Sequence, residues 1–193
     1  MKPEQKLQWL SYLPNIITIG RIIALVPLVW FMLKKDYQTA LIITFFAGLS
    51  DGLDGFLAKR FGWQGWWGGI LDPLADKAMM MLCYLVLAWQ SIIPIWLFVM
   101  VVARDVIIVL GTTYYHFKIG RIKQAQPTFW SKCNTVLQIL LILFLLLDLA
   151  DWWHLPFPMS WMFYAVGFTT LSSGIQYILM GRRMARQEQA DVN

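Results

Sequence analysis

The stretch SDGLDGFLAKRFGWQGWWGGILDPLADKAMM, residues Ser50 to Met80, combines dense negative charge with long apolar flanks. It holds four of the eleven acidic residues in the chain. A charged side chain in or near a bilayer costs at least ~2.5–3.5 kcal/mol, so four carboxylates must face water, metal ions or both. Oxygen-only clusters suit hard divalent cations such as Mg2+ or Mn2+. The stretch therefore predicts a metal site at a membrane surface, formed by Asp51, Asp54, Asp72 and Asp76.

The composition is that of a membrane protein. Of the 193 residues, 59% are hydrophobic and 14% are charged, whereas a soluble domain would carry about 25% charged residues. We therefore predict one polytopic membrane domain over residues 1–193, with no separate soluble domain. The net charge of +5 is scattered among apolar segments. It indicates membrane orientation and contact with anionic membrane lipid, and no nucleic-acid partner.

Six apolar segments follow one another along the chain, each close to the ~20 residues that a helix needs to cross the hydrocarbon core. Because a backbone in lipid must satisfy its own hydrogen bonds, helices are the expected structure. The predicted fold class is all-α, with six transmembrane helices and an exposed loop or short surface helix at Tyr115–Pro127. The segments are Leu13–Leu33, Tyr37–Leu57, Gly69–Trp89, Ile93–Tyr114, Phe129–Leu149 and Pro156–Met180.

The basic residues predict the orientation. Six crossings put both termini on one side of the membrane, and that side carries ten basic residues against two in the opposite connections, Lys34 and Lys35. The basic side is expected to be cytoplasmic. Both termini and the aspartate cluster should then face the cytoplasm, at the cytoplasmic (inner) membrane of a bacterium. The ten residues are Lys2, Lys6, Lys59, Arg60, Lys118, Arg121, Lys123, Arg182, Arg183 and Arg186.

The spacing of the aspartates suggests their chemistry. Asp51 and Asp54 are three residues apart and Asp72 and Asp76 are four apart, so each pair shares one face of a helix. If the two helices pack side by side, both pairs point into one cavity. Two metal ions would relieve the repulsion between the carboxylates and would also clamp a phosphate. With Lys59 within reach at the helix end, the residue types predict a metal-dependent phosphate or pyrophosphate site.

The same residues resemble a known signature. The pattern Asp54-Gly55-x2-Ala58-Lys59-x8-Gly68-x3-Asp72-x3-Asp76 is similar to that of the CDP-alcohol phosphatidyltransferase family, with Asp51 as its leading aspartate. The one departure is Lys59, where the family usually has arginine. Lysine keeps the charge but loses the bidentate fork, which weakens the grip expected on the nucleotide phosphate.

The resemblance implies a fold, a donor and a set of roles. It implies six transmembrane helices, a homodimer, a cytoplasmic-facing cavity, a CDP-diacylglycerol donor and two divalent ions, Mg2+ or Mn2+. Asp76 would also be the general base that takes a proton from the acceptor hydroxyl, and CMP would leave. By position in the signature, the metal ligands are Asp51, Asp54, Asp72 and Asp76, and the CDP moiety is lined by Asp54, Gly55, Ala58, Lys59 and Gly68.

Segments outside the signature bear on the acceptor. Leu13-Pro14-Asn15 with Thr18 and Arg21 resembles both the glycerophosphate-using and the cardiolipin-forming members of the family. Ala103–Asp105 is more similar to the cardiolipin-forming members, since the glycerophosphate enzymes usually have Arg-Glu there. Pro127–Thr135 is also more similar to the cardiolipin-forming members, since the glycerophosphate enzymes tend to have a second lysine where Asn134 stands. An acceptor pocket with one cation fewer suits a phosphodiester, which carries one negative charge, better than a phosphomonoester, which carries nearly two. Phosphatidylglycerol is therefore the favoured acceptor and glycerol-3-phosphate the alternative, with Arg104 and Lys132 as contacts to the acceptor phosphate.

Other interpretations stay open at this stage. The same carboxylates could serve a divalent-cation transporter, which the apolar far halves of the helices disfavour, or a lipid-binding scaffold without turnover. Arg104 could instead pair structurally with Asp105 or with another helix. Lys132 could simply extend its amine to the membrane surface. Arg21 fits a helix-end or packing role.

Overall fold

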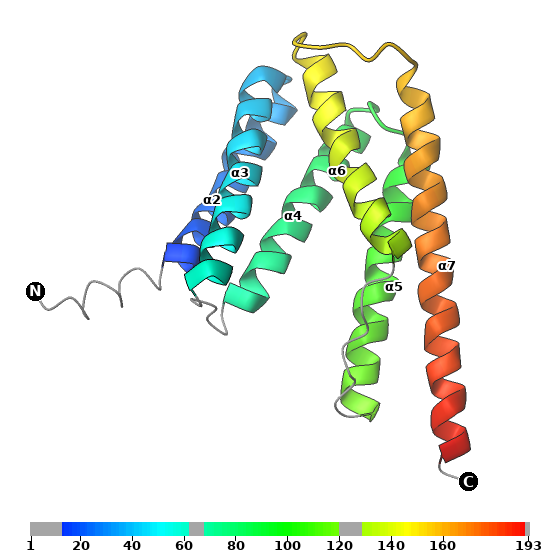
Figure 1. The fold of residues 1–193 in the computed structure, drawn as a ribbon. Coiled ribbons are helices and arrows are strands. Elements are labelled where there is room, and N and C mark those ends of the chain that lie inside the picture. The colour runs from blue at the N-terminus through cyan, green and yellow to red at the C-terminus, as the bar shows by residue number, and fades with distance from the viewer. Residues whose placement is uncertain (1–12, 62–67, 120–128, 192–193) are drawn as a thin grey trace, which may run out of the picture. The chain divides into compact units, whose positions relative to one another are not determined.

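The computed structural model describes residues 13–61, 68–119 and 129–191 of the chain, and these are entirely helical apart from short connections (Figure 1). Their side chains are described over residues 17–50, 75–111 and 129–181. The all-α prediction is confirmed for this part of the chain. The helices are α2 Leu13–Leu33, α3 Tyr37–Phe61, α4 Gly68–Trp89, α5 Ile95–Ile119, α6 Phe129–Leu149 and α7 Met159–Asp191.

The helix boundaries agree with the apolar segments at some ends and differ at others. The bounds of α2 and α6 are those predicted. Helices α5 and α7 begin only after Pro94 and Pro158, whose carbonyls accept the N–H groups of Leu97 at 3.0 Å and Trp161 at 3.1 Å. The predicted start at Pro156 is therefore wrong by three residues. Of the segment predicted as an exposed loop or a short surface helix, Tyr115–Ile119 is helical and continues α5, and residues 120–128 lie outside the described part.

The chain divides into two compact units, described separately here. The first contains α2, α3 and α4 together with residues 143–154, and α2 packs against both α3 and α4. Leu28, Met32 and Leu87 are fully buried in it. Gln90 ties the helix ends together, because its Nε2 donates to the Met32 carbonyl at 2.7 Å and its Oε1 accepts from the Tyr37 hydroxyl at 2.7 Å.

Two helices of the first unit end in the same motif. After α2, the Lys35 N–H donates to the Met32 carbonyl at 3.0 Å and the Asp36 N–H donates to the Phe31 carbonyl at 2.9 Å, with Lys35 at φ 61°. This is a Schellman closure, which satisfies the last helical carbonyls. An equivalent pair of hydrogen bonds follows α6, with Asp151 at φ 57°. Such closures let a short connection turn the chain back.

An exposed ion pair lies just beyond α6. The Nδ1 atom of His154 lies 2.7 Å from the Asp148 Oδ1, and Asp151 is 3.9 Å away on the other side of the ring. The hydrogen bond to Asp148 raises the pKa of His154 above its ordinary 6.5 and outweighs desolvation, which lowers it, and the negative charges of Asp148 and Asp151 raise it further.

We expect His154 to titrate above pH 6.5, and Asp148→Asn to bring its pKa back towards that value. A raised folded-state pKa means that the stabilisation is complete below pH 6.5 and is lost as the pH rises through the folded pKa. NMR of the imidazole signal in a His116→Gln background, which leaves one histidine, measures this. A pKa unchanged by Asp148→Asn would contradict the pairing.

The second unit contains α5, α7 and the first two-thirds of α6, and α5 runs alongside α7 (Figure 1). Gly167 permits their close approach, since a Cβ there would lie 2.8 Å from a ring carbon of Trp96. Trp96 also stacks on Tyr164, with ring centroids 6.0 Å apart. Leu97 and Val166 are completely buried.

Helix α7 exposes an apolar stripe at helical spacing. Its buried side chains are mixed, since Thr169, Thr170 and Ser173 are buried along with Met162 and Val166. A helix in water would expose polar side chains instead, so the stripe fits lipid as the surrounding solvent. Judged by the length and mean hydropathy of the described residues, only α6 is long and apolar enough to cross a membrane. The apolar portions Ile17–Leu33 and Tyr37–Ser50 are shorter. The stripe is Trp161, Tyr164, Phe168, Leu171, Ile175 and Ile178.

Candidate active site

The aspartates of the opening stretch lie on two helices of the first unit. Asp51 and Asp54 lie in α3, and Asp72 and Asp76 lie in α4, so each pair has the helical spacing that the sequence predicts. Only Asp76 belongs to the part whose side chains are described. The other predicted site residues lie outside that part, so their roles stay predictions. These residues are Asp51, Asp54, Gly55, Ala58, Lys59, Gly68 and Asp72.

Asp76 is held by an arginine from a different helix. Its Oδ1 accepts a hydrogen bond from the Arg21 Nη1 at 2.6 Å, in a pair that joins α2 to α4. The Arg21 side chain is 1% exposed, whereas that of Asp76 is 46% exposed. A buried guanidinium needs a hydrogen-bonded counter-charge. Arg21 therefore orients a carboxylate whose side chain is nearly half exposed.

The structure corrects the expectation for Arg21. The residue lies within α2, eight residues beyond its first residue, and its charged group reaches the predicted catalytic aspartate. The pairing joins positions 55 residues apart, so sequence spacing could not reveal it. The available signal was the charge itself, because an arginine inside an apolar segment needs a partner, and an intramembrane ionisable residue marks a functional site by default.

The donor set suits divalent cations in its chemistry. Four carboxylates on two helices that both pack against α2 offer only hard oxygen ligands, which Mg2+ and Mn2+ prefer. The carboxylate of Asp76, oriented by Arg21 and nearly half exposed, is accessible for such a role. Among the described side chains no group of three or more acidic, histidine or cysteine residues comes together. Asp76 is one of these described side chains, and its three predicted partners lie outside them.

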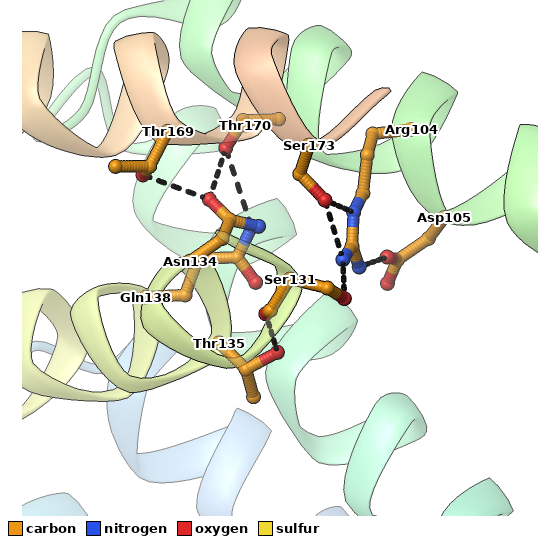
Figure 2. Close-up of polar contacts among 9 residues, drawn as sticks. All are labelled: Arg104, Asp105, Ser131, Asn134, Thr135, Gln138, Thr169, Thr170 and Ser173. Carbon is orange, nitrogen blue, oxygen red and sulfur yellow. Dashed lines mark hydrogen bonds and ion pairs between the residues drawn. The ribbon is translucent and has the colours of Figure 1, made fainter. Parts of the chain in front are cut away.

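The second unit carries a different polar site, centred on Arg104 (Figure 2). Arg104 on α5 is 8% exposed. Its Nη2 donates to the Ser131 Oγ of α6 at 2.6 Å and to the Ser173 Oγ of α7 at 3.0 Å. Its Nη1 donates to the Asp105 Oδ1 at 2.7 Å, and its guanidinium lies 6.0 Å from the Tyr177 ring centroid. Arg104 thus joins three helices, and the alternative of a structural pair with Asp105 is confirmed.

Asn134 forms a neighbouring cluster between α6 and α7 (Figure 2). It is completely buried, and its Oδ1 lies 3.0 Å from the Thr169 hydroxyl and 2.8 Å from the Thr170 hydroxyl. Its Nδ2 has no hydrogen-bond partner within the described part of the chain. Turning the amide over would satisfy the nitrogen and leave the oxygen alone instead. The neutral side chain of Asn134 is therefore integrated into the interface between α6 and α7.

Lys132 contrasts with Arg104. It follows Ser131 directly on α6 and is exposed, and its amine makes no hydrogen bond or ion pair with the described residues. Of the two residues predicted to contact the acceptor phosphate, Lys132 is the accessible one and Arg104 is largely committed to other side chains. Arg21 and Asp76 belong to the first unit, and Arg104 and Lys132 to the second.

Comparison with known proteins decides the family. Residues 11–173 match the family model described as CDP-alcohol phosphatidyltransferase. The chain belongs to the CDP-alcohol phosphatidyltransferase family. The family is membrane-associated and generally depends on divalent cations. The match includes the whole aspartate stretch and Arg21 as well as Arg104, Lys132 and Ser173 of the second unit.

Relatives in this family carry two different names. A human protein named cardiolipin synthase (CMP-forming) is 32% identical over 190 residues, which cover 89% of this chain and 62% of that protein. A protein of the same name from Streptomyces coelicolor is 30% identical over 190 residues, covering 92% of this chain and 86% of its own length. The CDP-diacylglycerol–glycerol-3-phosphate 3-phosphatidyltransferase of Aquifex aeolicus is 30% identical over 126 residues, which cover 64% of this chain and 68% of that protein.

The chain is shorter than several of these relatives. It spans 62% of the rat and human proteins and 30% of a Schizosaccharomyces pombe cardiolipin synthase fused to a mitochondrial hydrolase. The activities of those whole proteins are therefore only proposed for this chain.

Proposed function

We propose that this chain is a phosphatidyltransferase that moves the phosphatidyl group from CDP-diacylglycerol to phosphatidylglycerol and releases CMP. The observation that carries the proposal is Asp76, the last aspartate of the family signature. It is half exposed, and it is oriented at 2.6 Å by the buried Arg21. Such a carboxylate is suited to take a proton from a hydroxyl. The relatives named cardiolipin synthase support the choice of reaction.

We propose further that residues 1–193 form one membrane domain with six crossings. The family match spans both units of the structure, which supports a single domain. The described helices have 21 to 33 residues, and a rise of about 1.5 Å per residue makes each of them long enough for a ~30 Å hydrocarbon core. The stripe of exposed apolar side chains along α7 fits lipid as its solvent. Both termini and the aspartates would lie at the cytoplasmic face of a bacterial inner membrane, and the protein would be a homodimer.

The donor would bind over the aspartate stretch. Asp51, Asp54, Asp72 and Asp76 would hold two divalent ions, Mg2+ or Mn2+, which neutralise the pyrophosphate and polarise the phosphorus under attack. The CDP moiety would lie against Asp54, Gly55, Ala58, Lys59 and Gly68.

The chain's own residues would then perform the proton transfer and position the groups. The acceptor hydroxyl oxygen bonds to the lipid-side phosphorus as its proton passes to the Asp76 carboxylate. The phosphoanhydride P–O bond breaks, and CMP leaves with that electron pair beside Lys59. An aspartate is a weak base in water, so the orientation set by Arg21 contributes through proximity and alignment. Arg104 and Lys132 would hold the acceptor phosphate.

The acceptor can be tested directly with purified protein in liposomes that contain CDP-diacylglycerol and Mg2+ or Mn2+. We expect CMP release when phosphatidylglycerol is supplied and background release with glycerol-3-phosphate. The reverse outcome would establish the alternative, a glycerol-3-phosphate phosphatidyltransferase like the Aquifex aeolicus relative. Divalent-cation flux across the same liposomes without CMP release from either acceptor would favour a transporter.

A further inference from the structure

We propose that the first unit carries a separate lipid site, which holds one anionic glycerophospholipid in the half of the membrane opposite the aspartates. One acyl chain of this lipid lies in an apolar groove between α2 and α4, and the amine of Lys34 binds the headgroup phosphate. This inference rests on the membrane insertion of α2, which is part of the proposed function. It does not depend on the reaction or on the choice of acceptor.

The groove follows one face of α2, where that helix packs against α4. Its volume is about 370 Å³. Its ends, Leu25 and Leu33, are eight positions apart, which is about 12 Å of helix and close to one leaflet of a ~30 Å hydrocarbon core. An unfilled groove would lose dispersion contacts, so an acyl chain of one leaflet is the occupant that fits. The lining residues are Leu25, Val26, Val29, Trp30, Leu33 and Leu82.

A cation lies at one end of this groove. The Lys34 Nζ is 4.7 Å from the centroid of the Trp30 ring, which is itself part of the groove wall. The Lys34 N–H donates to the Trp30 carbonyl at 3.1 Å, so Lys34 continues the same helical face. The aromatic ring localises the ammonium, whose three N–H groups can donate to phosphate oxygens. Trp30 is 57% exposed, as suits an indole at a membrane interface.

The acidic residues near this end of the unit are engaged elsewhere. The carboxylate of Asp36 accepts two hydrogen bonds from the first turn of α3 as its N-cap. Asp148 and Asp151 lie 2.7 Å and 3.9 Å from ring nitrogens of His154. The Lys34 amine is exposed and makes no ion pair with a described residue. An anionic headgroup therefore complements a charge that the described part of the chain does not neutralise.

The two ends of the groove decide the direction of the lipid. Arg21 lies one helical turn before Leu25, but its side chain is 1% exposed and is paired with Asp76. It is therefore not presented to a headgroup at that end. Lys34 is 13 positions further along, about 20 Å away on a helix, and it is exposed. The headgroup accordingly lies at Lys34, and the acyl chain runs from there towards Leu25.

The test uses the full chain in neutral detergent micelles and phosphatidylserine with a photoreactive diazirine in one acyl chain. This lipid is anionic and carries neither proposed substrate headgroup. Irradiation should label the segment Leu25–Leu33 of α2 and the neighbourhood of Leu82 on α4. Unlabelled phosphatidylserine should compete roughly fivefold better than phosphatidylcholine with the same chains, the factor that one lysine provides for an anionic headgroup. Glycerophosphoserine, which lacks acyl chains, should not compete.

Two matched pairs of variants separate a defined site from general attraction. Lys34→Gln should abolish the roughly fivefold preference for phosphatidylserine. Lys35→Gln removes the same charge one residue further on, away from the groove wall, and should retain at least about half of the preference. Val29→Phe places a ring in the groove and should lower labelling by roughly tenfold. Ile42→Phe adds the ring at an exposed position of α3 outside the groove and should leave labelling unchanged.

Equal losses of preference in Lys34→Gln and Lys35→Gln would overturn the inference, as would labelling spread evenly over the exposed apolar helices. Groove labelling and a preference that Lys34→Gln leaves unchanged would assign the chain to a lipid with its headgroup elsewhere, such as the donor, and would overturn it too. An unlabelled groove, with an oligomeric state that Val29→Phe alters, would assign the groove to a second copy and also contradict the proposal.

The lysine pair alone still decides if Val29→Phe does not fold, because both lysines are exposed. Failure of the proposed function looks different from failure of this site. In that case the wild type would release no CMP with either acceptor, while phosphatidylserine would still label the groove.

Discussion

Asp76→Asn is expected to lower kcat for CMP release by about 10²–10⁴-fold, the range for loss of a general base. Asparagine has nearly the same shape as aspartate, and its oxygen can still accept the hydrogen bond that Arg21 Nη1 donates at 2.6 Å. It cannot take the proton of the acceptor hydroxyl, and it brings no charge to a metal ion. Release of CMP from CDP-diacylglycerol in liposomes, with phosphatidylglycerol as acceptor, measures the loss.

The matched control is Asp148→Asn, the same chemical change at an exposed aspartate that pairs with His154 beyond α6. It should leave CMP release at the wild-type rate. Because Asp76 is the counter-charge of the buried Arg21, the substitution should also lower folding stability, and kcat is therefore compared at a temperature at which both proteins are folded. Full activity in Asp76→Asn would show that another group takes the proton.

Arg21→Gln is expected to lower kcat by about 10–100-fold, as is typical when a group that orients a ligand or base is lost. The Arg21 side chain is 1% exposed, so glutamine keeps much of the packing and one donor but loses the charge that aligns Asp76. Arg21→Lys keeps the charge without the planar fork and should recover part of the activity. The measurements are kcat and the Mg2+ concentration for half-maximal activity.

A double variant distinguishes positioning from simple damage. If Arg21 acts through Asp76, then Arg21→Gln/Asp76→Asn should be no less active than Asp76→Asn alone, since residues that work as a unit are not additive. A structural effect of Arg21 would multiply with the loss at Asp76. Unchanged kcat and an unchanged Mg2+ requirement in Arg21→Gln would contradict the positioning role.

Much of the fold could be predicted from the sequence because apolar runs end at charged or turn-forming residues. The bounds of α2 and α6 follow from that rule. The C-terminal part of α7 does not, because hydropathy falls beyond Met180 while residues with good helix propensity continue to Asp191.

The residue types of the site could be predicted from the sequence, but the contacts between side chains of different helices could not. Spacing within α3 and α4 placed each aspartate pair on one helix. The contacts of Arg21 with Asp76 and of Arg104 with Ser173 join residues 55 and 69 positions apart. Such contacts depend on how helices pack, and no local pattern records them. Asp105 was accessible to sequence reasoning because it adjoins Arg104, and its ion pair at 2.7 Å bears out that alternative.

The apolar stripe of α7 has a consequence for how mutations should be tolerated along this helix, if the helix crosses the membrane as proposed. In lipid, one apolar surface gains nothing by leaving the solvent for another, so close packing and hydrogen bonds between helices hold the helix in place. Exchange of the exposed Leu171 or Ile175 for another apolar residue should then cost little. Exchange of the buried Thr169, Thr170 or Ser173 for a larger residue should cost more, because these small side chains lie where the helices meet.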